Sequence, residues 1–209
     1  MDGETLRDRV QESKRTALDR LGSEKALLAV TDADLETGTV LATAARSAAR
    51  DRDRFEAWAG TADHDDARAA FEAAAATRGD HYDRIVATLD GDPGDPDAAD
   101  DPVTDYLRGL EGDAERVAAG LVGRSLASER TLLQVVNFFV NEADSGRADL
   151  FREIRADERE LVDRGTATLD ALPGDPEAAL AAAEETVARA YEDYATTLES
   201  MGLDPKPVC

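Results

Sequence analysis

The chain has 209 residues and a formal net charge of −22 at pH 7, because 46 acidic side chains outnumber 24 basic ones. This length suits a single domain, residues 1–209, that can bury a substantial core. Such a charge leaves no basic patch of the kind that phosphate contacts require, so we expect no direct binding of nucleic acid.

The acidic residues are spread along the chain and are not gathered in a tail. At low salt such a charge repels itself and destabilises the compact state. In about 1 M salt the Debye length falls to ~3 Å, and the repulsion is screened. Many Asp, three Lys and abundant Ala are typical of proteins adapted to high internal salt. An ordinary acidic mesophilic protein is the alternative.

No segment of the sequence is typical of a membrane anchor or a secretion signal. There is no run of about 18 apolar residues, and the N-terminus, Met1-Asp2-Gly3-Glu4, lacks a basic-then-apolar pattern. Cys209 is the single cysteine, so no internal disulfide forms. We therefore expect a cytoplasmic protein without membrane contact.

Apolar residues recur at helical spacing through the first half of the chain. The spacing predicts three main helices separated by short breaks: Leu6 to Leu21, Leu41 to Ala59 and Phe71 to Leu89. A further short segment reaches about Val30, residues 63–66 form a turn, and residues 90–101 form a loop rich in Gly, Pro and Asp.

The second half follows the same plan. A helix begins at Pro102, which suits a first helical turn, and its apolar spacing continues to Leu121. The stretch 132–140 is the most apolar, so we expect it at the centre of the core, with Asn137 and Asn141 in need of hydrogen-bond partners. Further helices are predicted over 150–169 and 180–201. No strand pattern occurs, so the fold class is all-α, a helical bundle.

An internal repeat relates the two halves at an offset of 80 residues. The segment 88–96, Thr-Leu-Asp-Gly-Asp-Pro-Gly-Asp-Pro, recurs at 168–176 as Thr-Leu-Asp-Ala-Leu-Pro-Gly-Asp-Pro, and Phe71 aligns with Phe151. We interpret residues 41–99 and 121–179 as a duplication. Chance similarity between helix ends of biased composition is the alternative.

Two related helix pairs, each with a Phe two helical turns before a polar position, resemble the ferritin-like superfamily and its rubrerythrin-like members over about residues 35–172. The resemblance implies a four-helix bundle built from two duplicated helix pairs, with extra N- and C-terminal helices. It also implies a Glu from the first helix of each half and a Glu-x-x-His from the second, which together bind iron or manganese.

The sequence departs from that ligand pattern. Arg78 stands where the first half needs a Glu, and Leu161 where the second half needs a His. The ligands that remain are divided between the halves: His81, Glu129 and Glu158. We therefore expect no catalytic residue, no cofactor and no metal. A reduced iron or manganese site at these three remnant positions is the alternative.

Positions 78 and 158 are related by the repeat and face each other in a two-fold bundle. We predict that Arg78 and Glu158 form a core ion pair with His81 beside it. The alternative places both side chains on a solvated face. Losing one partner of a buried pair costs roughly 3–5 kcal/mol, although the intact pair adds little net stability.

Segments 27–31, 55–59 and 134–142 resemble a family of small haloarchaeal proteins, some of which are named transcription antitermination protein. If so, the acidic surface implies action through a protein partner. We expect a non-catalytic, halophile-adapted bundle that regulates transcription through such a partner. The alternatives are a rubrerythrin-like metal-dependent oxidoreductase and a homodimer formed through the 132–140 face or the closing helix.

Overall fold

The computed structural model describes residues 1–97 and 102–206. Within these ranges the regular secondary structure is helical, and no strand occurs. The helices in chain order are α1 (Gly3–Ser13), α2 (Arg15–Leu21), α3 (Lys25–Val30), α4 (Thr37–Ala59), α5 (Asp65–Val86), α6 (Pro102–Arg108), α7 (Asp113–Val117), the π-helix η1 (Ala118–Arg124), α8 (Ser125–Asn141), α9 (Ser145–Ala171) and α10 (Pro176–Ser200).

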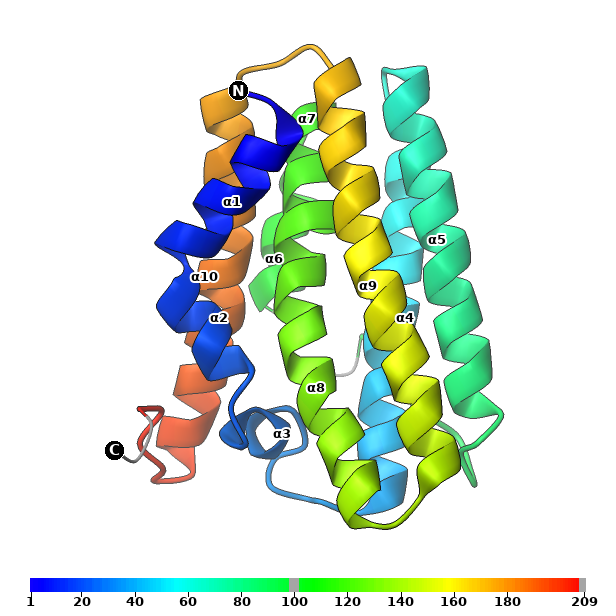
Figure 1. Ribbon diagram of the computed structural model, residues 1–209. Coiled ribbons are helices and arrows are strands. Elements are labelled where there is room, and N and C mark those ends of the chain that lie inside the picture. Colours follow the sequence, from blue (N-terminus) through cyan, green and yellow to red (C-terminus); the bar gives the residue numbers. More distant parts are fainter. Residues whose placement is uncertain (98–101, 207–209) are drawn as a thin grey trace.

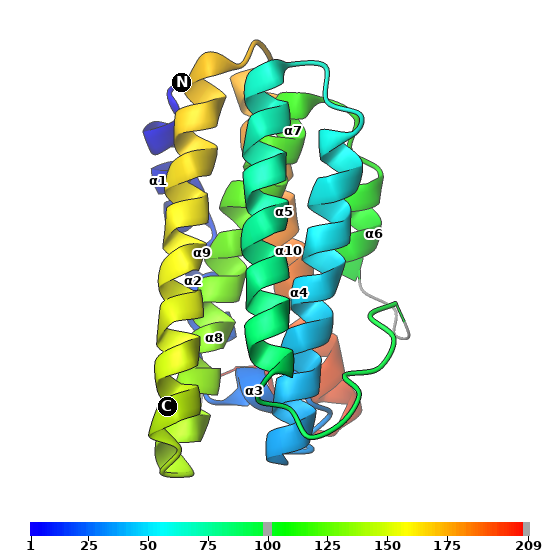
Figure 2. The ribbon, with the colours of Figure 1, turned by 90° about the vertical axis from the view of Figure 1, so that its right-hand side faces the viewer.

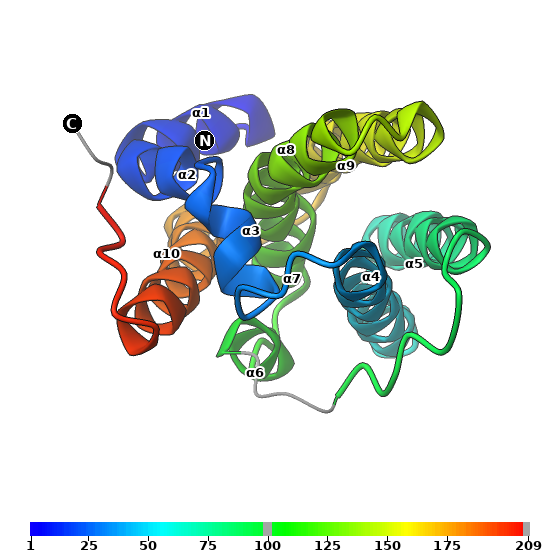
Figure 3. The same ribbon diagram turned by 90° about the horizontal axis from the view of Figure 1, so that it is seen from below.

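Four long helices, α4, α5, α8 and α9, run alongside one another (Figure 1). The tightest packing is within the pairs α4–α5 and α8–α9, and α5 lies between α9 and α4 (Figure 2). Seen from below, α1, α2 and α10 pack on the far side of α8, and α3 crosses between α10 and α4 (Figure 3). Helices α5 and α9 begin at Asp65 and Ser145, positions that are 80 residues apart like the sequence repeat.

Several helices are preceded by an aspartate whose side chain caps the first turn. The Asp144 side chain accepts from the Arg147 backbone N–H at the start of α9, and this bond lowers the pKa of Asp144. Asp175 caps α10 in the same way, with Pro176 in the first turn. These two caps help to set where α9 and α10 start.

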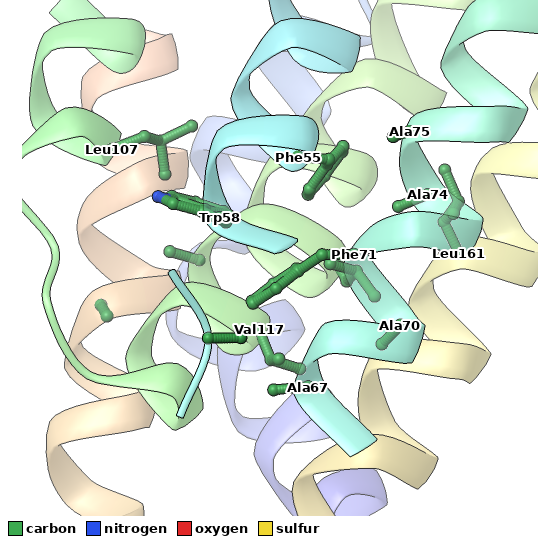
Figure 4. Packing of buried hydrophobic residues seen from close by; sticks show 14 of the residues in the cluster. Phe55, Trp58, Ala67, Ala70, Phe71, Ala74, Ala75, Leu107, Val117 and Leu161 are labelled. Carbon is green, nitrogen blue, oxygen red and sulfur yellow. The ribbon is translucent and has the colours of Figure 1, made fainter. Parts of the chain in front are cut away.

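Two aromatic layers fill the bundle. In the first, Phe55 stacks on Phe71 with ring centroids 6.3 Å apart, and Trp58 lies 5.4 Å from Phe71 (Figure 4). In the second, Phe139 and Phe151 stack at 5.5 Å. Each of these rings is buried. Aromatic pairs at such distances add to the stabilisation from their buried area.

The prediction of one continuous helix over 102–121 is wrong, because the helix is interrupted in the middle of this range. Helix α6 ends at Arg108, residues 109–112 are not helical, and α7 begins at Asp113. The buried Asp113 carboxylate accepts the backbone N–H groups of Asp63 and His64, each at 2.9 Å. This contact, distant in sequence, fixes where the new helix starts.

The stretch 132–140 is not the centre of the core. It lies in the C-terminal half of α8, where only one face is covered, and Val140 is 50% exposed. Asn137 and Asn141 are exposed, so they need no buried partner. The high apolarity of this stretch indicated a helix that packs on several neighbours. It did not indicate where in the bundle the stretch lies.

Several predicted boundaries also shift. The first predicted helix breaks at Lys14, and α5 begins inside the predicted turn, with His64 at its N-cap, and ends at Val86. The closing helix packs inward through Tyr194 and Leu198. Cys209 and the end of the 90–101 loop lie outside the described residues. None of the helices described is long and apolar enough to cross a membrane.

Candidate functional site

A buried ion pair lies between the two aromatic layers. Arg78 follows Phe71 by two helical turns on α5, and Glu158 follows Phe151 by the same spacing on α9, which runs in the opposite direction (Figure 1). Both side chains are buried, 3% and 0% exposed. Arg78 Nη1 donates to Glu158 Oε1, and Nη2 donates to Oε2 at 2.8 Å. The structure thus brings together the two residues expected to pair. Both lie in the interior and not on a solvated face.

A second carboxylate and a second arginine complete the charge balance. Asp51 of α4 is buried, with Oδ2 3.7 Å from Arg78 Nη2. Arg124 Nε donates to Asp51 Oδ1 at 3.2 Å, and its Nη2 donates to Ser47 Oγ at 2.8 Å. Two guanidinium groups therefore face two carboxylates. Since unpaired buried charges are costly, the four groups depend on one another.

Hydroxyl groups from α8 extend the network. Ser128 Oγ donates to Glu158 Oε1 at 3.0 Å, and Ser125 Oγ accepts from Arg78 Nη2 at 3.4 Å. Charged groups hydrogen-bonded in this way are held in one geometry. Glu158 consequently has both oxygens occupied by donors from the chain itself.

The π-helix η1 carries Arg124 to this network. Wide turns of this kind inside α-helices often occur at functional sites. Gly123, next to Arg124, lies so close to α10 that a Cβ there would be 2.6 Å from the carbonyl oxygen of Ala183. Glycine thus allows α10 to pack directly against η1.

His81 lies beside the ion pair and is 1% exposed. Its Nε2 is 3.0 Å from Asp157 Oδ2. Burial, and secondarily the charge of Arg78, lower the pKa of His81, whereas Glu158 and Asp157 act in the opposite direction. The lowered pKa favours the neutral imidazole, and the Asp157 carboxylate, which can only accept, favours the tautomer with its proton on Nε2.

The third remnant position, Glu129, pairs with arginines outside this network. The Glu129 carboxylate contacts Arg155 Nη2 and Arg159 Nη2, each at 2.7 Å. Within residues 1–97 and 102–206, no three His, Cys, Asp or Glu side chains gather as metal ligands would. With the Arg78 guanidinium seated on Glu158, the residues present do not fit the two-metal centre of the ferritin-like pattern.

A cavity of about 400 Å³ reaches this network from the side of α4 and α8. These two helices make few backbone contacts, which leaves room between them. The cavity is lined by α3, α4, α8 and α10, and Arg78, His81 and Glu158 contribute to its wall. It is the part of the site that can admit a small molecule.

Sequence reasoning missed Asp51, Asp157 and Arg124. Asp51 lies in the alternating run 50–54, whose charges neutralise one another and suggest a solvated face. Its spacing from Ala48 and Phe55, three and four residues, places it on the buried face of α4 and was the available signal. Asp157 and Arg124 carry no comparable signal.

Comparison with models of known protein families, with curated proteins and with solved structures finds no match to this chain.

Proposed function

We propose that this protein is a ferritin-like four-helix bundle, built from two duplicated helix pairs with extra terminal helices, that works without a metal centre and without catalysis. The observation that carries the proposal is the Arg78 guanidinium bound through two nitrogens to Glu158 at the middle of the bundle. The Glu158 carboxylate, which a metal would need as a ligand, is thus already paired with a cation of the chain itself.

The proposal has a direct test in metal content. Protein purified in high salt without chelators is expected to hold iron, manganese and zinc far below one atom per chain. Near-stoichiometric metal that is lost in His81→Ala but kept in the control His64→Ala, at the other and exposed histidine, would contradict it. That result would favour the rubrerythrin-like oxidoreductase.

We further propose that the protein acts through a protein partner in transcription, as the haloarchaeal resemblance implies. The net charge of −22 supports this, because an acidic surface repels RNA but does not prevent contact with another protein. High salt screens the charge and permits such contact.

This second part is tested by transcription with a haloarchaeal RNA polymerase across a U-rich terminator at high salt. Added protein is expected to raise read-through, whereas a labelled RNA of the same terminator shows no binding to the protein alone. Unchanged read-through at saturating protein, or direct RNA binding, would contradict the proposal.

A further inference from the structure

A cluster of three arginines on α8 and α9 holds an excess of positive charge in a chain whose net charge is −22. All three contact one carboxylate: Arg155 Nη2 and Arg159 Nη2 each lie 2.7 Å from Glu129 Oε1, and Arg130 Nε lies 3.6 Å from Oε2. No other carboxylate within residues 1–97 and 102–206 lies within 4.0 Å of these guanidinium groups. Three positive charges therefore face a single negative one.

Most carboxylates of this part of α9 pair with side chains of other helices. Three of them contact α5, where Glu153 pairs with Arg84, Asp157 with His81 and Glu158 with Arg78. One turn after the cluster, Asp163 lies 3.9 Å from Arg7 of α1. The two arginines of the cluster on α9 instead contact α8, which lies alongside (Figure 1). Helix α9 thus separates its charges, and Glu129 is left as the counter-charge of the cluster.

The arginines cover Glu129 and keep hydrogen-bond donors accessible. The Glu129 side chain is 12% exposed, whereas those of Arg155, Arg130 and Arg159 are 24, 40 and 56% exposed. Among the described residues, Nη1 of Arg155, Nη1 of Arg159 and both Nη atoms of Arg130 have no hydrogen-bond partner. None of these atoms on Arg130 and Arg155 is a buried one. The cluster therefore presents unused N–H groups to solvent.

The charge and the donors of the cluster suit a phosphate group. Guanidinium groups bind phosphate and carboxylate through two N–H groups at once. At neutral pH a phosphate monoester has a charge of about −1.5 to −2 and three strong acceptor oxygens, which matches the excess charge and the three donor side chains. A carboxylate offers one charge and two oxygens. Asp8, Glu12 and Asp19 line a hollow together with Arg130, so the anion is expected on the α9 side of the cluster.

We propose that Arg130, Arg155 and Arg159 form a binding site for a doubly charged phosphate group, either the free ion or the terminal phosphate of a larger molecule. A nucleic-acid backbone has one charge per phosphate and is bound by extended basic surfaces, which this isolated cluster does not provide. The site therefore agrees with the expected lack of nucleic-acid binding. It goes beyond the proposed function and does not depend on it.

Calorimetric titration with inorganic phosphate, phenyl phosphate and dimethyl phosphate, at pH 7.5 in about 1 M KCl, tests the proposal. We expect saturable one-to-one binding of inorganic phosphate. Dimethyl phosphate should bind at least about tenfold more weakly, because the diester has a single charge and fewer charged oxygens to accept from arginine. Phenyl phosphate that binds as tightly as inorganic phosphate would assign the site to the terminal phosphate of a larger molecule, and binding of inorganic phosphate alone to the free ion. No saturable binding of either dianion, or equal binding of the diester, would overturn the proposal.

Substitutions locate the binding. Arg155→Gln and Arg159→Gln each remove one guanidinium group and should weaken phosphate binding by at least about tenfold. Arg159→Lys keeps the charge but loses the planar pair of donors, so it should weaken binding less than Arg159→Gln. Arg68→Gln is the matched control, because Arg68 is an exposed arginine of α5 that pairs with Asp65 and its loss changes the net charge equally. The control should bind as the wild type does. Equal weakening in the control and the cluster variants would indicate general attraction to cations and refute the proposed site.

Discussion

The aromatic layer of Phe55, Trp58 and Phe71 lies on α4 and α5, whereas the polar layer around Arg78 and Glu158 lies on α5 and α9. Phe71 and Arg78 are about two helical turns apart on α5. Both layers are buried, but they respond differently to loss of a partner. An apolar ring that loses its neighbour still prefers the core. A buried charge that loses its counter-charge strongly lowers the free energy of unfolding. The aromatic layer thus supplies stability, and the polar layer imposes one partner on each charged group.

Among apolar side chains, the largest expected effect is in the aromatic layers. Phe71→Ala and Phe151→Ala remove fully buried rings that stack on Phe55 and Phe139, so each should lower the free energy of unfolding by about 3–5 kcal/mol. Denaturant unfolding at constant high salt measures this. Phe138→Ala, a half-buried ring, is the control and should cost less. Equal losses at all three sites would mean that burial does not govern this core.

The π-helix joins the polar layer to α10, and substitution of its glycine is expected to have a smaller effect than loss of an aromatic ring. Gly123→Ala places a methyl group against the Ala183 backbone, so we expect a loss of about 1–3 kcal/mol in unfolding free energy. Gly38→Ala is the matched control, because it lies in α4 with open space around it and should gain up to about 1 kcal/mol. A stabilised Gly123→Ala variant would show that α10 does not pack this closely.

The smallest effect is a pH dependence confined to the polar layer. The pKa of His81 is lowered in the folded state, mainly by burial, so the unfolded chain binds this proton more readily. Stability should therefore fall as pH drops below about 6.5, the pKa of the unfolded residue, until the lower folded pKa is passed. Unfolding of wild type and His81→Gln between pH 7.5 and pH 5 measures the difference.

The expected control is His64→Gln, since His64 is the other histidine and its side chain is exposed. It should retain the wild-type pH dependence. If His81→Gln also retains it, the buried imidazole is not its source.

The two layers also differ in how much of each can be predicted from the sequence. Helical spacing predicted the helix content, because apolar periodicity reports directly which face is buried. The pairing of Arg78 with Glu158 was predicted from an interpretation of the repeat as a two-fold duplication, and the two side chains are in contact. Composition did not place the stretch 132–140, since apolarity does not specify which part of a helix is covered.

The remaining parts of the site depend on long-range packing. Asp51 lies within a run of alternating charges that suggests a solvated face, and its contacts with Arg78 and Arg124 reveal its role. Helix α10 packs closely against Gly123 of the π-helix, a contact between distant segments that single-sequence patterns do not register. The cavity exists because α4 and α8 stay apart, a property of the whole assembly.

The most direct test of the account is a double-mutant cycle on the central pair. Unfolding free energies would be measured at one high salt concentration for wild type, Arg78→Leu, Glu158→Leu and the double variant. The account predicts that each single variant loses roughly 3–5 kcal/mol, because it strands a buried charge, and that the double variant is more stable than either. A double variant that loses the sum of the two single losses, or single variants that unfold like the wild type, would contradict it.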